Sequence, residues 1–264
     1  MKTVAESRAN VVSSFTIIKG SLIAETWEAF RCWDLSVSKQ ENLQRIKSDK
    51  LIRAKSANWL RDVAFVLGRR FDPDGRDRPL VELAKAGCRR EVWDPLLLWH
   101  LTRDEFLVRD FFISWLYGQF ADGVFRLHPA DVAPYLRSLS KKRGIEWSGK
   151  WSEATTERVA TGLLRMAADF GLMSGGSSKE FASYHLPEES FLYLLHAMTD
   201  AGLHAKRLVE APDWKMFLMD ASDVERELLR LHQFRKVHYE VAGTIVQLDL
   251  PFPSAAAYAK EISG

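Results

Sequence analysis

Basic side chains gather in one short stretch of this 264-residue chain, between Arg137 and Lys150. Three consecutive cations occupy positions 141 to 143, and the one acidic residue of the stretch is Glu146. Ammonium and guanidinium groups clustered in this way bind phosphate, which is the chemistry that nucleic-acid backbones offer. The net charge of +2 is too small to indicate a nucleic-acid binder by itself, so the clustering carries this interpretation.

Short polar side chains follow this cluster, at the predicted start of a helix over residues 152–170. The Ser152 hydroxyl can accept from a free backbone N–H there and so cap the helix. In helix-turn-helix proteins the second helix enters the major groove, and its first residues meet base edges and phosphates. Residues 172–186 predict a hairpin with a Gly/Ser-rich tip, from which Lys179 would reach the DNA backbone or the minor groove. The predicted DNA-contacting residues are Lys141, Lys142, Arg143, Lys150, Ser152, Thr155, Thr156, Arg158, Arg165 and Lys179.

Several features of this region weigh against DNA contact. The basic loop is much longer than the usual turn of about 3–4 residues between such helices. Glu153 and Glu157 would repel phosphate. Trp147 and Trp151 could stack on bases of a single strand, but we expect them to pin the long loop onto the body of the protein. Winged helices also serve as protein–protein modules, so an adaptor function stays open.

The chain lacks the motifs that carry most nucleotide and nucleophile chemistry. It contains no GxxxxGK[ST], GxGxxG, GxSxG or HExxH pattern. Its histidines at positions 196, 204, 232 and 238 share no metal-ligand spacing. The sequence therefore predicts a protein that is not an enzyme and needs no metal or cofactor. A second basic cluster, at residues 69–78, is diluted by aspartates and predicts a solvated loop.

Helical spacing of apolar residues dominates the first 120 positions. The predicted helices there span residues 20–33, 40–50, 55–71, 79–86, 93–102 and 104–120. A short strand at 124–127 precedes a helix for which Asp131 is the expected N-cap, with Pro134 in its first turn. Gly171 is the expected residue after the end of the helix over 152–170. Beyond the hairpin we expect helices at 188–199, 222–230 and 254–262, and a strand-like stretch at 237–250.

These elements predict a mainly α fold, with an N-terminal helical bundle, a winged helix-turn-helix and short β-hairpins. The expected domains are residues 1–120, 121–190 and 191–264, the last packed on the winged helix. No apolar run approaches the ~20 residues that span a bilayer, and no signal peptide is evident, so we expect a cytoplasmic protein. Cys32 and Cys88 lack CxxC spacing and predict small buried side chains without a disulfide.

Segments spread over most of the chain resemble the BrxA family of bacterial BREX phage-defence systems. They are FTIIKGSLIAET at 15–26, SANWLRDVAFVLGRRF at 56–71, residues 106–120, RVATGLLRMAADFGLM at 158–173 and VQLDLPFPSAAAY at 246–258. The resemblance implies a helical bundle like the NusB antitermination fold together with a winged-helix part. It also implies double-stranded DNA binding without catalysis, alongside other BREX proteins. The chain looks longer than typical members, with extra length expected at 72–95 and 200–222.

Three functions remain open from the sequence. The first is a non-enzymatic accessory protein that binds double-stranded DNA in phage defence. The second is a protein–protein adaptor within the defence complex, and the third is an RNA-binding factor like NusB. The oligomeric state stays open between a monomer and a weak dimer.

Overall fold

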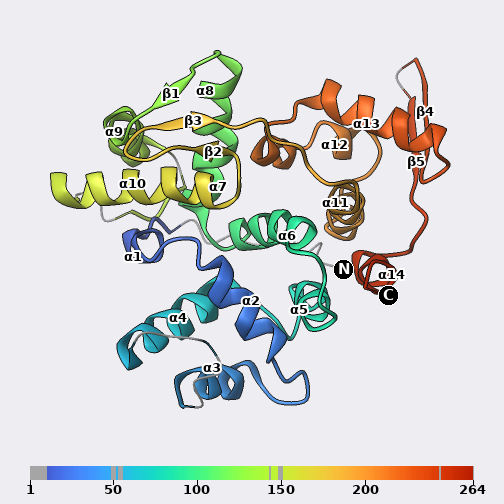
Figure 1. Cartoon of the computed structure of the whole chain (residues 1–264). Helices are drawn as coiled ribbons and strands as arrows, with labels where there is room; N and C mark the ends of the chain where they lie inside the picture. The colour runs from blue at the N-terminus through green and yellow to red at the C-terminus, as the bar shows by residue number, and fades with distance from the viewer. Residues whose placement is uncertain are drawn as a thin grey trace.

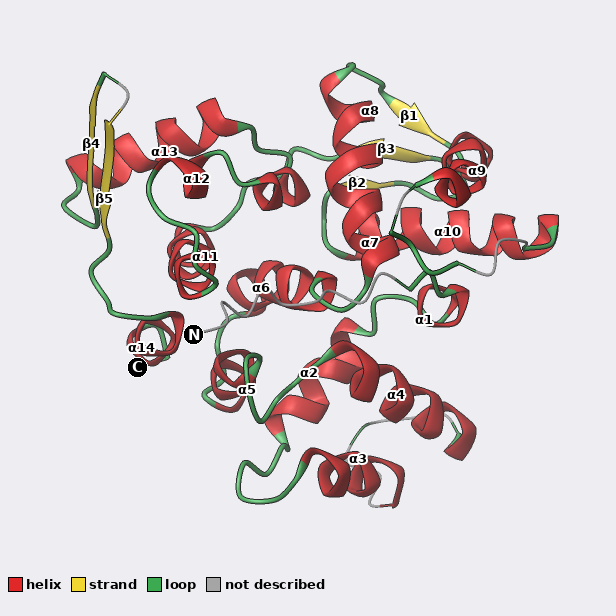
Figure 2. Ribbon diagram, turned by 180° about the vertical axis from the view of Figure 1, so that it is seen from behind, coloured by secondary structure: helices red, strands yellow, loops and turns green. Residues whose placement is uncertain are grey.

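The computed structural model describes residues 11–48, 52, 56–142, 144–147, 151–243 and 245–263. Within these ranges the protein is mainly helical and has two small antiparallel sheets (Figures 1 and 2). This confirms the predicted fold class of a mainly α protein with short hairpins. No helix in the described ranges is both long and apolar enough to cross a membrane.

The N-terminal part consists of helices that begin and end close to the predicted residues. Ser56 caps α4, because its hydroxyl accepts from the Trp59 backbone N–H at 3.2 Å. The short helix α1 was not predicted, because five residues are too few to show helical spacing. The elements are α1 (Ser14–Ile18), α2 (Ile23–Arg31), α3 (Lys39–Ser48), α4 (Ala57–Arg70), α5 (Arg78–Lys85) and α6 (Arg90–Thr102).

The predicted long helix over 104–120 is present, but its middle turns are wider than in an α-helix. It runs through α7 (Phe106–Asp110), a π-helix (Phe111–Leu116) and α8 (Tyr117–Ala121). Phe111, Phe112 and Leu116 are buried, as expected for a helix that is apolar nearly all round. This continuous segment connects the N-terminal helices to the small sheet (Figure 2).

The next segment contains β1 (Arg126–Leu127), α9 (Pro129–Ser138), a 3-10 turn (Leu139–Lys141), α10 (Glu153–Asp169), β2 (Met173–Ser174) and β3 (Lys179–Phe181). The sheet order is β1-β3-β2, with both pairs antiparallel. Gly171 adopts a φ of 77° after α10, as its predicted place requires. The predicted cap of α9 was wrong: His128 is the N-cap, and Asp131 lies one turn inside, accepting from the His128 backbone N–H at 2.7 Å.

The C-terminal part packs back onto the rest of the chain. It contains α11 (Glu188–Asp200), α12 (Lys206–Val209), a 3-10 helix (Pro212–Phe217), α13 (Ala221–Gln233), β4 (His238–Ala242), β5 (Ile245–Asp249) and α14 (Ala255–Glu261). Helix α14 lies against both α5 and α11, so the end of the chain returns to the N-terminal bundle (Figure 1).

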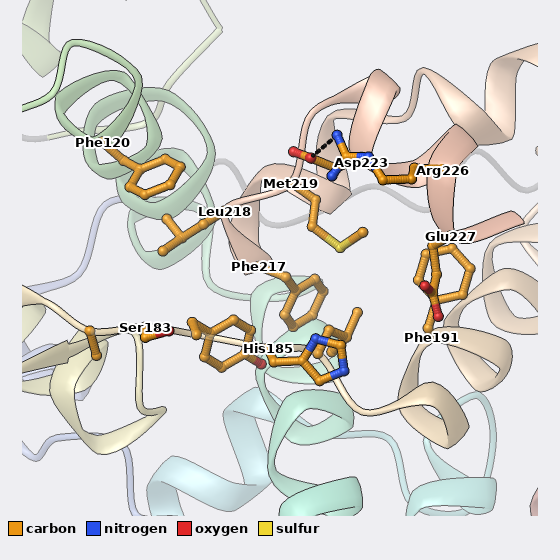
Figure 3. A pocket seen from close by; sticks show the side chains of 13 residues that line it. Phe120, Ser183, His185, Phe191, Phe217, Leu218, Met219, Asp223, Arg226 and Glu227 are labelled. Atoms are coloured by element: carbon orange, nitrogen blue, oxygen red, sulfur yellow. Dashed lines mark ion pairs between the residues drawn. The ribbon is translucent and has the colours of Figure 1, made fainter. Parts of the chain in front are cut away.

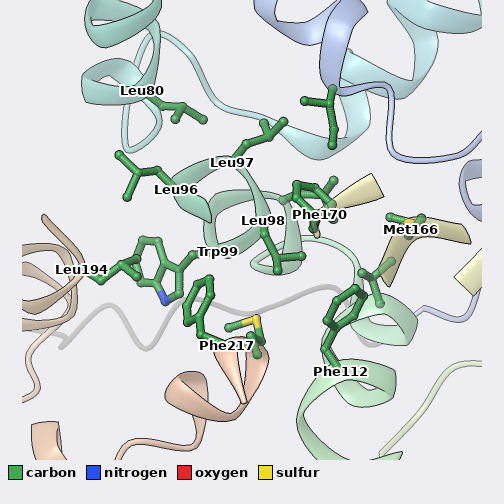
Figure 4. Close-up of a cluster of buried hydrophobic side chains, with 14 of the residues drawn as sticks. Leu80, Leu96, Leu97, Leu98, Trp99, Phe112, Met166, Phe170, Leu194 and Phe217 are labelled. Carbon is green, nitrogen blue, oxygen red and sulfur yellow. The ribbon is translucent and has the colours of Figure 1, made fainter. Parts of the chain in front are cut away.

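Helix α6 lies at the centre of one continuous apolar core (Figure 4). Leu96, Leu97, Leu98 and Trp99 are all buried and meet side chains from both halves of the chain. The core cluster runs from Val12 to Ala259, so the three expected segments share their buried surface. The division into separate domains stays a prediction.

The basic cluster at residues 69–78 is a solvated loop only in part, since Asp72, Asp74 and Arg78 are exposed but one of its arginines is not. Arg70 is fully buried and donates to the backbone oxygens of Thr16, Gly20 and Ser21 at 2.8–3.1 Å. Burial lowers the pKa of Arg70 to about 10, against the opposing effect of the Glu105 carboxylate, so the guanidinium stays charged at neutral pH. Arg70 therefore holds α4 to the segment around α1 and is not free to bind phosphate.

One of the two cysteines also departs from expectation. Cys88 is buried, but Cys32 is exposed, because it lies just after the end of α2. Both thiols are free, as predicted.

Candidate nucleic-acid interface

Helix α10 is held firmly from behind by the N-terminal segment. Gly162 faces the backbone of α1 so closely that a Cβ built there would lie 2.9 Å from the Ile17 carbonyl oxygen. The Ser21 hydroxyl donates to the Asp169 carboxylate at 2.6 Å near the other end of the helix. Both views place α10 between α1 and the β1-β3-β2 sheet (Figures 1 and 2). The helix is therefore fixed in place before any ligand arrives.

The outward face of α10 carries a stripe of exposed polar residues. Arg158, Thr161 and Arg165 are exposed and follow one another at spacings of three and four, which aligns them on one side of a helix. Neither Arg158 nor Arg165 forms an ion pair within the described ranges. We call these three residues the α10 stripe. Of the predicted contacts, the two arginines are the ones that the fold leaves best placed to meet a ligand.

Polar side chains in the first turn of α10 form hydrogen bonds within the helix. Ser152 is the N-cap, accepting from the Thr155 backbone N–H at 3.2 Å, as predicted. The Thr156 hydroxyl donates to the Ser152 carbonyl oxygen at 3.1 Å and the residue is buried. We therefore remove Thr156 from the candidate contacts, since its hydroxyl cannot reach a ligand. Ser152 is exposed and Thr155 half-buried, so both remain candidates.

The carboxylate of Glu153 is partly neutralised by a neighbour that was not among the candidates. Arg137, at the end of α9, donates to Glu153 Oε2 at 2.7 Å. This exposed ion pair contributes little to stability, on the order of 0–1 kcal/mol. It does place a positive group beside one of the two acidic residues that weigh against phosphate contact.

The cations of the basic loop between α9 and α10 differ in whether they are paired with a carboxylate. Lys141 is exposed, whereas the Lys142 ammonium donates to both carboxylate oxygens of Asp110, at 2.5 and 2.6 Å. The Tyr135 hydroxyl donates to the same carboxylate at 2.7 Å, and burial, helped by the Asp110 charge, holds the pKa of Tyr135 well above its usual value. Arg143 and Lys150 lie outside the described residues.

This loop is attached to the body of the protein at two further points. The Val12 backbone N–H donates to the Glu146 carbonyl oxygen at 3.2 Å. The rings of Trp147 and Trp151 meet edge to face, 5.3 Å between centroids, and both pack against the core. The two half-buried indoles thus have the packing arrangement that we expected of them.

The hairpin tip is tied to its own backbone. Lys179 is half-buried, and its ammonium donates to the Gly175 carbonyl oxygen. On the neighbouring strand, Arg126 pairs with Glu180 at 2.5 Å. Lys179 would therefore have to exchange an internal hydrogen bond for a phosphate, which makes it a weaker candidate than Arg158 or Arg165.

Three hydrogen-bonded polar side chains in the core are of the types found in catalytic relays, but they are buried and a substrate cannot reach them. His100 Nδ1 lies 2.7 Å from Asp77 Oδ1, and His100 Nε2 lies 2.9 Å from the Tyr193 hydroxyl. Burial lowers the pKa of His100 more than Asp77 raises it, so the ring is neutral and accepts from Tyr193. All three side chains are buried, and we interpret them as a structural link between α5, α6 and α11.

A cavity of about 520 Å³ opens between the segment after β3 and the start of α13 (Figure 3). Its wall is polar and apolar in about equal parts, and its charged groups are paired: Arg226 with Asp223 at 3.0 Å, and Glu227 with Arg230 at 2.6 Å. Across the described ranges, no group of three or more His, Cys, Asp or Glu side chains could hold a metal ion.

The cavity described above can take up an apolar side chain. Its apolar residues are Phe120, Leu186, Phe191, Phe217, Leu218 and Met219.

The sequence model of one known family matches residues 14–197, which is more than half of the chain. The chain belongs to the BrxA family. This confirms the resemblance seen in the sequence, and the BrxA match ends before the tail segment at 246–258. A crystal structure of an uncharacterized protein from Magnetospirillum magneticum shares the fold with a TM-score of 0.55 and 14% identity. The similarity covers 72% of this BrxA chain and 95% of that protein. No curated protein matches the sequence.

Proposed function

We propose that this BrxA protein is a non-enzymatic accessory protein that binds double-stranded DNA in a bacterial BREX phage-defence system. The α10 stripe is the observation that carries this proposal. Two exposed arginines lie on the open face of a helix that is fixed from behind by α1. A guanidinium offers five donors in a planar fork, which suits phosphate oxygens and the edge of guanine.

The order of elements around α10 supports a winged-helix interpretation. A helix, a short strand, two helices and a hairpin follow one another, and β1 pairs with the second strand of the hairpin. In this arrangement α10 takes the place of the recognition helix and residues 173–181 form the wing. Winged helices serve both as DNA-binding and as protein-binding modules, so this order of elements supports the fold part of the proposal and the α10 stripe supports DNA binding.

Each remaining candidate has a distinct role in the proposed complex. Arg158 and Arg165 contact phosphate or a base edge, Lys141 supplies further charge, and Ser152 and Thr155 reach phosphate at the helix start. Lys142 mainly fixes the loop through Asp110. The acidic residue Glu157 lies on the exposed part of α10 and limits how closely the first turns approach a strand.

Competition between nucleic acids separates this proposal from the RNA-binding alternative. We expect a labelled duplex to be displaced by unlabelled duplex DNA and much less by single-stranded RNA of the same sequence. Steep loss of duplex affinity with salt is expected as well, since each phosphate contact releases counterions. Preferential displacement by RNA would favour the NusB-like function instead. We also expect no metal-dependent nuclease and no ATPase activity; turnover abolished by a point mutation in the protein would overturn this part.

The adaptor function is favoured by one observation, the cavity beside α13 with large apolar residues in its wall. Met219 and Phe120 line it, and Phe120 is 39% exposed, so a partner's apolar side chain could enter. If the protein is an adaptor, Met219→Glu should abolish co-purification with other BREX proteins expressed together with it. DNA binding by the same variant should be unchanged, because the cavity does not include α10.

A further inference from the structure

The β4–β5 hairpin, at the opposite end of the molecule from α10 (Figure 1), has an open edge. Its antiparallel register pairs Ala242 with Ile245 and Val241 with Val246. Two residues separate Ala242 from Ile245, so these two close the hairpin with hydrogen bonds. Because hydrogen-bonded and non-hydrogen-bonded pairs alternate, Val246 and Leu248 direct their backbone N–H and C=O groups away from β4.

The two edges of this hairpin differ. On the β4 side, the outward N–H of Tyr239 donates to His232 Nδ1 at 3.1 Å, and α13 packs against β4. On the β5 side, α12 lies near the strand, but no hydrogen bond to the outward backbone groups of Val246 or Leu248 occurs within the described residues. An unpaired strand edge is a template for another strand, so the β5 edge keeps its backbone groups available for pairing.

Apolar side chains continue along one face to the free end of the hairpin. Tyr239, Val241, Val246 and Leu248 share that face, since alternate residues of paired strands point the same way. Tyr239 is buried against the body of the protein, but Val241 is 53% exposed. At the turn, Ile245 on the other face is 70% exposed. A strand added to β5 would satisfy the open backbone groups and place its own side chains beside Val246 and Leu248.

We propose that the β5 edge pairs antiparallel with β5 of a second copy of this chain, about a twofold axis at Gln247. In this register, Val246 lies opposite Leu248 of the second copy, and Leu248 lies opposite Val246 of that copy. These are the residues whose backbone groups point outward, so the hydrogen bonds of the new pair form in register. The twofold axis makes the contact self-complementary, as a closed dimer requires.

Charge distinguishes this pairing from the alternative through β4. At the centre of a β5 pair, Gln247 meets Gln247 of the second copy. Its amide nitrogen donates to Asp249 Oδ2 at 2.9 Å, which leaves a second N–H and the amide oxygen for the facing amide. A symmetric β4 pair would instead place Glu240 directly opposite Glu240 of the second copy. Like charges directly opposite one another destabilise a strand pair. The sequence of the hairpin thus favours the β5 edge, as its open backbone does.

The resulting dimer is small and therefore weak. Two five-residue strands and their flanking side chains bury far less than a standard stable interface of about 1,600 Å². Dimerisation should thus depend strongly on concentration, without DNA and without any other protein. The proposal does not rest on the DNA-binding function, since the two surfaces lie on different elements.

Sedimentation velocity over a concentration series tests the dimer, with proline variants that form a matched pair. Val246→Pro and Val241→Pro each remove an outward N–H from one residue of the same non-hydrogen-bonded pair, so neither removes a hydrogen bond between β4 and β5. We expect the wild-type mass to rise toward two chains with concentration, V241P to follow it, and V246P to weaken association about tenfold or more. Wild type that stays monomeric at every concentration would overturn the proposal, as would equal association of both proline variants.

A second variant keeps the test decisive if both prolines disturb the hairpin. Gln247→Glu leaves the backbone intact but places two carboxylates face to face at the twofold axis, so it should shift the protein to the monomer. Glu240→Gln is its control, and it should associate like the wild type. Association of Q247E as strong as that of the wild type would contradict the β5 pairing.

Discussion

The cations of the candidate interface differ in what the fold leaves them free to do. Lys142 is bound by Asp110 on both carboxylate oxygens, whereas Arg158 and Arg165 are exposed without an ion pair in the described ranges. A cation already paired with a carboxylate releases fewer counterions when DNA arrives, because its own charge is compensated. Counting basic residues in the sequence therefore overstates the charge that is available.

This difference changes the effect expected from removing the loop cations. Replacing Lys141, Lys142 and Arg143 together with Ala would flatten the slope of log affinity against log salt by about 2.7 if all three contacted phosphate. Because Lys142 is tied to Asp110, we expect a flattening of about one to two units, and almost none for Lys142→Ala alone. Fluorescence anisotropy of one labelled duplex at several salt concentrations measures the slopes. A full effect from Lys142→Ala would show that its ion pair with Asp110 opens when DNA binds.

The buried His100 predicts a specific pH dependence of stability. Its pKa in the folded protein is lowered below 6.5, mainly by burial, so in the window below 6.5 the unfolded chain binds a proton that the folded one does not. The contribution of neutral, buried His100 to the free energy of unfolding is therefore complete above this pH window. It is lost as the pH falls through the window. Urea unfolding between about pH 8 and pH 5 should show a shallower loss for His100→Gln than for the wild type. Equal pH profiles would mean that His100 does not titrate differently in the two states.

Local signals were enough to predict most helices but not their partners. Ser152 and Gly171 were correctly assigned because a cap and a left-handed end depend on neighbouring residues only. The burial of Arg70 could not be predicted, since its carbonyl partners lie about fifty positions earlier in the chain. The same holds for Thr156, whose burial depends on how α10 packs.

The position of α10 depends on a close contact between two elements. At Gly162, a Cβ would lie 2.9 Å from the Ile17 carbonyl oxygen, so α1 would have to move. We expect Gly162→Ala to destabilise the protein by about 1–3 kcal/mol, despite the better helix propensity of Ala. The matched control is Gly118→Ala in α8, where a Cβ meets nothing within 4 Å; it should be neutral or slightly stabilising. Chemical denaturation compares them, and equal stability of both variants would show that α1 yields easily.

At the scale of the whole molecule, one core joins the segment that carries α10 to both ends of the chain. Helix α14 packs on α5 and α11, and α6 contributes to the core on both sides. The sequence predicted the order of these elements and the BrxA resemblance, but not that α14 returns to the N-terminal bundle. Such a scaffold can hold α10 rigidly while the outer edge of β5 stays available for the proposed pairing with a second copy.

The central claim is that the α10 stripe binds duplex DNA. Its most direct test is the salt-dependent duplex affinity of Arg158→Gln/Arg165→Gln, beside Arg31→Gln/Arg207→Gln as a control. The control removes the same charge from two exposed arginines on α2 and α12. We expect the α10 variant to lose about 1–3 kcal/mol of binding free energy and to flatten the salt slope by about one to two units, with the control close to the wild type. Equal affinities and slopes for the two variants would contradict the account.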